Sequence, residues 1–193
     1  MKNINESGRS MIEMLGVLSI IGILTVGGYG LVSKMQRNQR MNEVTDNLVT
    51  LARKARQVSR DYYIEGETIK SMCGESACSS FADYVQYGKA YPEELTYSGG
   101  DFVDERNDVT YNVTYVGNNI IMFMVSASGL DEQTCMQLAT MNYGTPSTSG
   151  YMGMNIGADS STAALASLSR QQKTIGEAVT ACTGKSVVYL AFR

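Results

Sequence analysis

The sequence predicts an α+β protein in which a long N-terminal α-helix packs on an antiparallel β-sheet. Three observations lead to this fold class. A run of twenty uncharged, mainly apolar residues extends from Met14 to Ser33, and an amphipathic helical stretch follows it. Two later segments, 108–128 and 186–192, are rich in β-branched and aromatic residues, which favour strands. Roughly 160 residues remain outside the apolar run, which suits one globular domain.

The apolar run is long enough to cross a membrane as a helix. Twenty helical residues rise about 30 Å, the thickness of a bilayer's hydrocarbon core. We therefore expect residues 9–33 to form the membrane-spanning half of a helix that extends from about Arg9 to about Ile64. Each helical glycine costs up to about 1 kcal/mol relative to alanine, and small residues also let helices approach closely. The run is thus expected to bend easily at its glycines, Gly16, Gly22, Gly27, Gly28 and Gly30.

The second half of the helix, residues 34–64, is predicted to dock on a domain core. Apolar residues recur there at alternating spacings of three and four, which places them on one helical face. They are Met41, Val44, Leu48, Leu51, Ala55, Val58 and Tyr62. No proline or glycine lies between Gly30 and Gly66, so nothing in the sequence ends the helix at the membrane surface.

The remaining residues, 65–193, predict a mixed head domain. Segments 108–116 and 120–128 flank a Gly-Asn-Asn turn and predict an antiparallel hairpin. Segment 186–192 is apolar on both faces, as a central strand would be. Three segments predict short helices: 79–88, 131–142 and 162–182, the last in one or two pieces. In that last segment five residues are compatible with one face: Leu165, Leu168, Ile175, Val179 and Cys182.

The composition argues against an enzyme. The chain has no histidine, which excludes Ser-His-Asp and Cys-His catalytic sets and any zinc site that needs imidazole. It also carries no nucleotide-binding motif. We therefore predict no catalytic residue, no cofactor and no metal. Four carboxylates in the segment GGDFVDERND could bind calcium, but we expect a solvated loop there: Asp101, Asp104, Glu105 and Asp108.

The four cysteines all follow the apolar run: Cys73, Cys78, Cys135 and Cys182. An even set on one side of a membrane segment predicts disulfides in an oxidising compartment. Three pairings are possible, and buried free thiols or a four-cysteine zinc site are the structural alternatives.

Charge is distributed unevenly along the chain. Residues 34–60 carry seven basic and two acidic residues, whereas residues 61–193 carry seven basic and fifteen acidic residues. A basic helix and an acidic head favour attraction between copies of the chain. The alternatives are a solvated helix face or contact with lipid phosphates. A nucleic-acid site is not indicated, because the basic stretch lacks interleaved aromatic residues.

The N-terminus closely resembles the class III signal of type IV prepilins. The residues that carry this resemblance are Gly8, Arg9, Ser10, Met11, Ile12 and Glu13, followed by the apolar run and the amphipathic helix. In that family a prepilin peptidase cuts after the glycine and methylates the new N-terminal amine. The glutamate then faces that amine on a neighbouring subunit. The resemblance implies a leader of residues 1–8, cleavage between Gly8 and Arg9, and an assembly role for Glu13.

The C-terminal part resembles the disulfide-bounded region of type IVb pilins. That likeness rests on LDEQTCMQLATMN, AVTAC and the terminal strand segment SVVYLAF. It implies the pairs Cys135–Cys182 and Cys73–Cys78, and a disulfide-bounded region of residues 135–182. It also implies the type IV pilin fold and a major pilin that polymerises into a homo-oligomeric helical filament. The subunit would wait in the inner membrane with its head in the periplasm, served by prepilin peptidase and the pilus assembly machinery.

Other interpretations share the same N-terminus. The chain could be a minor pilin or a type II secretion pseudopilin. It could also be a single-pass membrane-anchored periplasmic domain that does not polymerise, or a secreted protein whose first thirty residues are a signal peptide. One departure from the family is Arg9, where pilins usually have an apolar residue. Arg9 lies four residues before Glu13, a spacing at which the two can form an internal ion pair.

Overall fold

The head of the protein is an α+β structure with one antiparallel sheet. The computed structural model describes residues 5–73, 80–116 and 122–193, and the side chains of 11–23, 32–59, 80–116 and 122–193. The described chain divides into two compact units, Met1–Arg40 and Met41–Arg193. From Met41 onward, the amphipathic half of the N-terminal helix therefore belongs to the same unit as the head.

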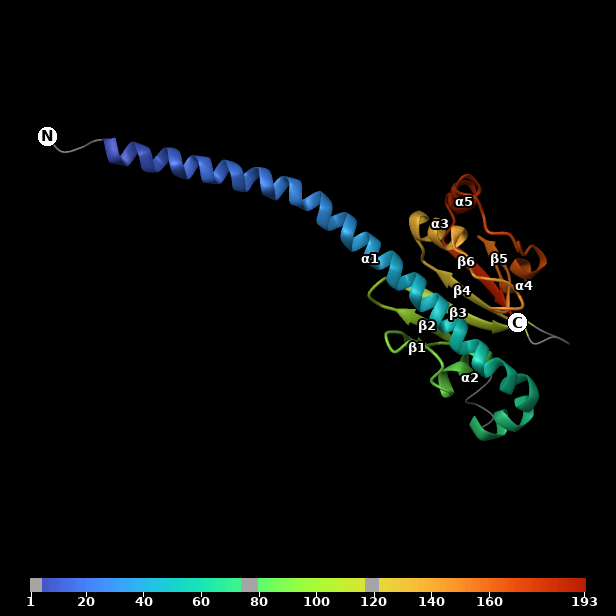
Figure 1. Ribbon diagram of the computed structural model, residues 1–193. Helices are drawn as coiled ribbons and strands as arrows, with labels where there is room; N and C mark the ends of the chain where they lie inside the picture. Colours follow the sequence, from blue (N-terminus) through green and yellow to red (C-terminus); the bar gives the residue numbers. More distant parts are fainter. Residues whose placement is uncertain (1–4, 74–79, 117–121) are drawn as a thin grey trace. The chain divides into compact units, whose positions relative to one another are not determined.

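The N-terminal helix, α1 (Asn5–Cys73), is longer at both ends than expected (Figure 1). It continues past Ile64 and through Gly66, because a single glycine weakens a helix without ending it. The backbone is also helical through Gly22, Gly27, Gly28 and Gly30. The flexibility expected at these glycines stays a prediction.

Six strands form the sheet in the order β1-β2-β3-β4-β6-β5, with every neighbouring pair antiparallel. The predicted hairpin is confirmed as β3 and β4, and the predicted terminal strand is β6, which lies between β4 and β5. Sequence reasoning missed the other three strands. The strands are β1 (Thr96–Ser98), β2 (Asp101–Asp104), β3 (Val109–Tyr115), β4 (Phe123–Ser128), β5 (Tyr151–Ile156) and β6 (Val187–Phe192).

Four shorter helices accompany the sheet in the described residues: α2 (Phe81–Tyr87), α3 (Glu132–Thr140), α4 (Ser161–Ala166) and α5 (Ile175–Cys182). Side chains cap their N-termini, and α2 and α5 have capping boxes in which Ser80 pairs with Asp83 and Thr174 with Glu177. The hydrogen bonds from Thr174 hold the pKa of the Glu177 carboxyl below its usual value. The predicted helical segment 162–182 therefore contains two separate helices, α4 and α5.

The main core lies between one face of the sheet and α1, α2, α3 and α5. The predicted stripe of α1 is confirmed as the docked face from Val44 to Val58, because Val44, Leu48, Leu51 and Ala55 are buried and Val58 packs against the core. Met41 is half-buried, and the side chain of Tyr62 lies outside the described residues. Successive strand residues alternate between the two faces of the sheet. A smaller cluster around Met124, Ala164 and Ala191 therefore lies on the opposite face, beneath α4.

The expectation that segment 162–182 has one shared apolar face is wrong. Leu165 and Leu168 pack on the smaller cluster beneath α4. In α5 the inward residues are Ala178 and Cys182, four positions apart, and Ile175 is 77% exposed. Ile175 lies seven residues before Cys182, close to the same side of the helix, but it is the first residue of α5 and stays exposed, as does Val179.

Candidate functional site

The N-terminal half of α1 presents an uncovered apolar surface. Nine of its large hydrophobic side chains are between 53% and 74% exposed: Met11, Ile12, Met14, Leu15, Val17, Leu18, Ile20, Ile21 and Ile23. Successive helical positions lie about 100° apart, so these residues surround the helix on every side. A continuous apolar surface of this kind marks a site of contact with protein or lipid.

Within the part of the chain whose side chains are described, no helix is both long and apolar enough to cross a membrane. That part omits residues 24–31, which belong to the uncharged run.

The predicted assembly residue Glu13 is exposed on this helix, between the exposed side chains of Ile12 and Met14. The predicted processing residues, Gly8 and Arg9, belong to α1, but their side chains lie outside the described residues. The pairing of Glu13 with an N-terminal amine therefore stays a prediction, as does its pairing with Arg9.

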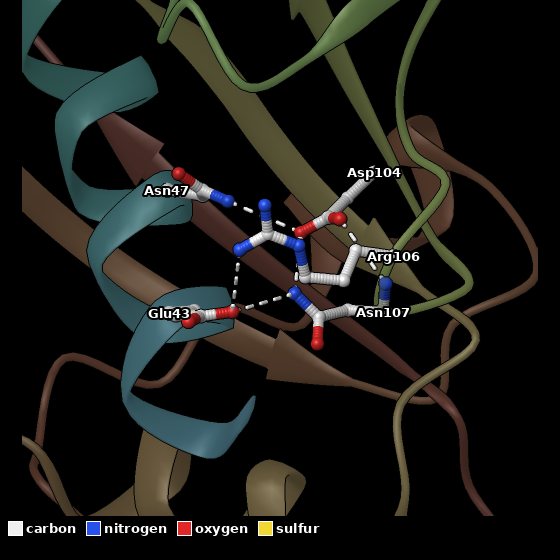
Figure 2. A network of polar contacts seen from close by, with 5 residues as sticks. All are labelled: Glu43, Asn47, Asp104, Arg106 and Asn107. Atoms are coloured by element: carbon white, nitrogen blue, oxygen red, sulfur yellow. Dashed lines mark hydrogen bonds and ion pairs between the residues drawn. The ribbon is translucent and has the colours of Figure 1, made fainter. Parts of the chain in front are cut away.

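In the head, a polar network ties α1 to the turn after β2 (Figure 2). Asp104 is only 4% exposed. Its Oδ2 accepts hydrogen bonds from Asn47 Nδ2 at 3.1 Å and Asn107 Nδ2 at 2.8 Å, and its Oδ1 accepts from the Asn107 backbone N–H at 3.1 Å. At the solvent-exposed edge of this network, Arg106 Nη1 lies 3.7 Å from Glu43 Oε2 and forms an ion pair with it. This network fixes the position of α1 along the sheet.

The expectation of a solvated loop at 99–108 is wrong. Residues 101–104 form β2, and both Asp104 and Asn107 are buried. Asp104 follows Phe102 by two residues, and alternate strand residues share a face. This spacing could have indicated that Asp104 faces inward, although it does not identify the residues that Asp104 contacts.

The calcium alternative finds no support in the described residues, where no three acidic or cysteine side chains are grouped to hold a metal ion. Two of the four side chains proposed for it have hydrogen-bond partners in the head. Asp104 accepts from the two asparagines, and Asp101 Oδ1 accepts from Asn112 Nδ2 at 2.6 Å.

Cys135 and Cys182 form a disulfide that joins α3 to α5, which is the pairing implied by the resemblance. Both residues are buried in the core. The predicted pair Cys73–Cys78 lies outside the described residues. Cys135 and Cys182 are 47 residues apart in the sequence. In the chain-entropy model, a disulfide that closes a loop of that length contributes about 4 kcal/mol to the free energy of unfolding.

Comparisons of this chain with protein-family models, with curated proteins and with solved structures found no match.

Proposed function

We propose that this chain is the structural subunit of a type IV pilus, most similar to the type IVb major pilins. The observation that carries the proposal is the apolar surface on all sides of α1 between Met11 and Ile23. A helix that docks on one partner needs one apolar stripe, whereas a helix surrounded by lipid or by other helices needs apolar residues all round. The helix would be surrounded by lipid while the subunit is in the membrane and by other helices once it is in the filament core. Apolar residues on all sides suit both states.

Glu13 gives this helix a specific pairing group. A carboxylate within an apolar surface is costly to bury unless it meets a cation. Cleavage between Gly8 and Arg9 would create that cation as a new N-terminal amine, which the neighbouring subunit's Glu13 would accept in the filament.

The head is compatible with the type IVb proposal. It combines an antiparallel sheet with a disulfide that joins α3 to the end of α5, five residues before the central strand β6 begins. The proposed location of the subunit is the inner membrane, with the head in the periplasm, and then the extracellular pilus. Prepilin peptidase and the assembly machinery are its proposed partners.

The first test examines the mature protein and its filaments. In the source cells, mass spectrometry of the N-terminus should find a chain that begins at a methylated Arg9. Electron microscopy should find filaments that are lost when the gene is deleted.

The second test removes the charge of Glu13. Glu13→Gln should leave membrane insertion and cleavage unchanged and reduce filament number, because the amine then lacks its anionic partner. The matched control is Glu93→Gln, at an exposed position of the head. Equal filament numbers in both variants would contradict the pairing role.

The alternatives predict other results. A cleaved chain that is required for filaments but scarce in them would indicate a minor pilin or pseudopilin. A chain that retains Met1 would indicate an anchored domain that does not polymerise.

A further inference from the structure

A groove with an apolar floor lies beside α1 in the head, with two arginines on its α1 side and the uncharged residues Asn142, Thr148 and Ser149 on its other side. Its volume is about 440 Å³, and it separates α1 from the segment 141–149 and the end of β6. We call it the basic groove. Its principal lining residues are Val49, Ala52, Arg53, Arg56, Tyr143 and Phe192. Its lining includes two arginines and no acidic residue.

Arg56 is held in place at this groove. Its Nε donates a hydrogen bond to the backbone oxygen of Arg193 at 3.0 Å. Its guanidinium also packs over Gly150, where an added Cβ would lie 2.8 Å from Arg56 Cζ and would overlap the Arg193 oxygen. Gly150 has a φ of +73°. Glycine has no Cβ, so it adopts this backbone conformation readily and also leaves room for the Arg56 guanidinium. The positive charge at one end of the groove is therefore fixed.

A second groove, of about 570 Å³, has the opposite charge. It lies between α1 and the β1–β2 region, and its lining includes five carboxylates and one base, Arg106, which pairs with Glu43. Three of these carboxylates belong to exposed residues: Asp46, Glu94 and Glu105. We call these three residues the acidic edge.

The two grooves lie on opposite flanks of α1. The buried stripe runs through Val44, Leu48 and Leu51. At 100° per residue, Glu43 and Asn47 fall on one side of that stripe, and Ala52 and Arg56 fall on the other. The sheet agrees with this placement, because the acidic groove includes residues of β1 and β2 and the basic groove includes Phe192 of β6, toward the other edge.

We propose that the basic groove receives the acidic edge of a second copy of this chain. The inference rests on the proposed function, in which that copy is a neighbouring subunit. Charge complementarity selects the occupant, since Asp46, Glu94 and Glu105 are exposed and Arg53 and Arg56 face no acidic residue in the groove lining. The acidic edge and the basic groove are different surfaces, although Asp46 and Arg53, seven positions apart, both lie on the outward side of α1. A contact that repeats from each copy to the next is head-to-tail and extends into an open assembly unless it closes into a ring.

The apolar floor gives this contact a component that salt does not screen. Exposed ion pairs contribute little individually and weaken with ionic strength. Burial of the half-exposed side chains of Val49 and Tyr143 beneath a docked segment adds a hydrophobic term. The proposed contact should therefore weaken with salt without disappearing.

A charge exchange tests the docking in cells that assemble the full chain. Arg53→Glu alone should reduce filament number by about tenfold or more, because like charges then face each other. The pair Glu94→Lys with Glu105→Lys should do the same. A chain carrying all three substitutions should recover filaments in part, because position 53 again faces opposite charges at positions 94 and 105 across subunits, while Arg56 and Asp46 keep their charges. Arg170→Glu, at an exposed position outside both grooves, is the control and should have no effect.

Unchanged filament number in Arg53→Glu, or no recovery in the combined variant when its protein level equals that of the wild type, would overturn the docking. Absence of filaments from the wild-type chain would instead refute the proposed function.

If the wild-type chain forms no filaments, cross-linking still tests the docking. A chain with Arg53→Cys and Glu105→Cys should form dimers and higher multimers in cells treated with a bismaleimide. The control with Arg170→Cys and Glu105→Cys should not. Equal cross-linking of the two chains would overturn the proposal, whether or not filaments form.

Discussion

Asp104 shows how amide groups hold a buried carboxylate in place by hydrogen bonds. Two asparagines, Asn47 of α1 and Asn107 of the turn, donate to its two oxygens. A buried charged group is stable only when such donors replace its water. The carboxylate therefore holds two distant parts of the chain together through acceptor sites alone.

We predict that Asp104→Asn lowers the free energy of unfolding by about 1–3 kcal/mol. The new amide nitrogen would face donor groups of Asn47 or Asn107, leaving them unpaired. Urea unfolding followed by circular dichroism measures this change. Asp46→Asn makes the same chemical change at an exposed position of α1 and should alter stability by less than about 0.5 kcal/mol. Equal losses in the two variants would contradict a structural role for the network.

Tyr143 and Tyr151 form a stacked pair in the core, with ring centroids 5.1 Å apart. Burial raises the pKa of Tyr151 to about 12, and burial together with the neighbouring Tyr151 raises the pKa of Tyr143 further. Unfolded tyrosines release their protons near pH 10, whereas the folded pair keeps them. Above that pH the unfolded state binds fewer protons than the folded state, so stability falls as pH rises.

We predict that the free energy of unfolding declines from about pH 10 upward, and that Tyr151→Phe makes this decline shallower. The Tyr151 hydroxyl has no hydrogen-bond partner among the described residues, so its removal should cost little at neutral pH. Urea unfolding at a series of pH values measures both effects. The exposed Tyr87→Phe is the control. A Tyr151→Phe profile identical to that of the wild type would contradict the assignment.

Among the elements, α3 and α5 depend most on each other. They have nine and eight residues, too few for stable isolated helices in water. Packing and the Cys135–Cys182 disulfide hold them in place.

We predict that replacing both cysteines by alanine lowers the free energy of unfolding by about 2–5 kcal/mol. The bond restricts the unfolded chain, so its removal favours the unfolded state. Thermal unfolding of the oxidised proteins measures the loss. Thr180→Ala, on the exposed side of α5, should have little effect. Wild-type stability in the alanine variant would show that packing alone holds the two helices.

At the scale of the whole molecule, the sequence predicted the elements whose signal is local. The stripe of α1 repeats over several turns, and β3, β4 and β6 are rich in β-branched and aromatic residues. The strands that were missed lack such a signal. β1 has three residues, and β5 contains Gly153, Asn155 and two methionines. The strand conformation of β5 comes from pairing with β6, much later in the chain, whereas the short strands β1 and β2 pair with each other across Gly99 and Gly100.

The candidate sites also divide into those whose residues are contiguous in the sequence and those whose residues are far apart. The apolar helix and Glu13 could be located because their pattern is contiguous. The Asp104 network and the two grooves could not, since each combines residues of α1 with residues at least forty positions later. Only the fold brings these residues together.

The place of β6 in the sheet has a consequence for the rate of folding. β6 pairs with β4, which ends at Ser128, although β6 begins only at Val187. The entropy lost in closing so long a loop slows sheet formation. Once Cys135 and Cys182 are joined, only the short arms from Ser128 to Cys135 and from Cys182 to Val187 still have to close. The oxidising power of the compartment in which the chain folds thereby controls how quickly the centre of the sheet is completed.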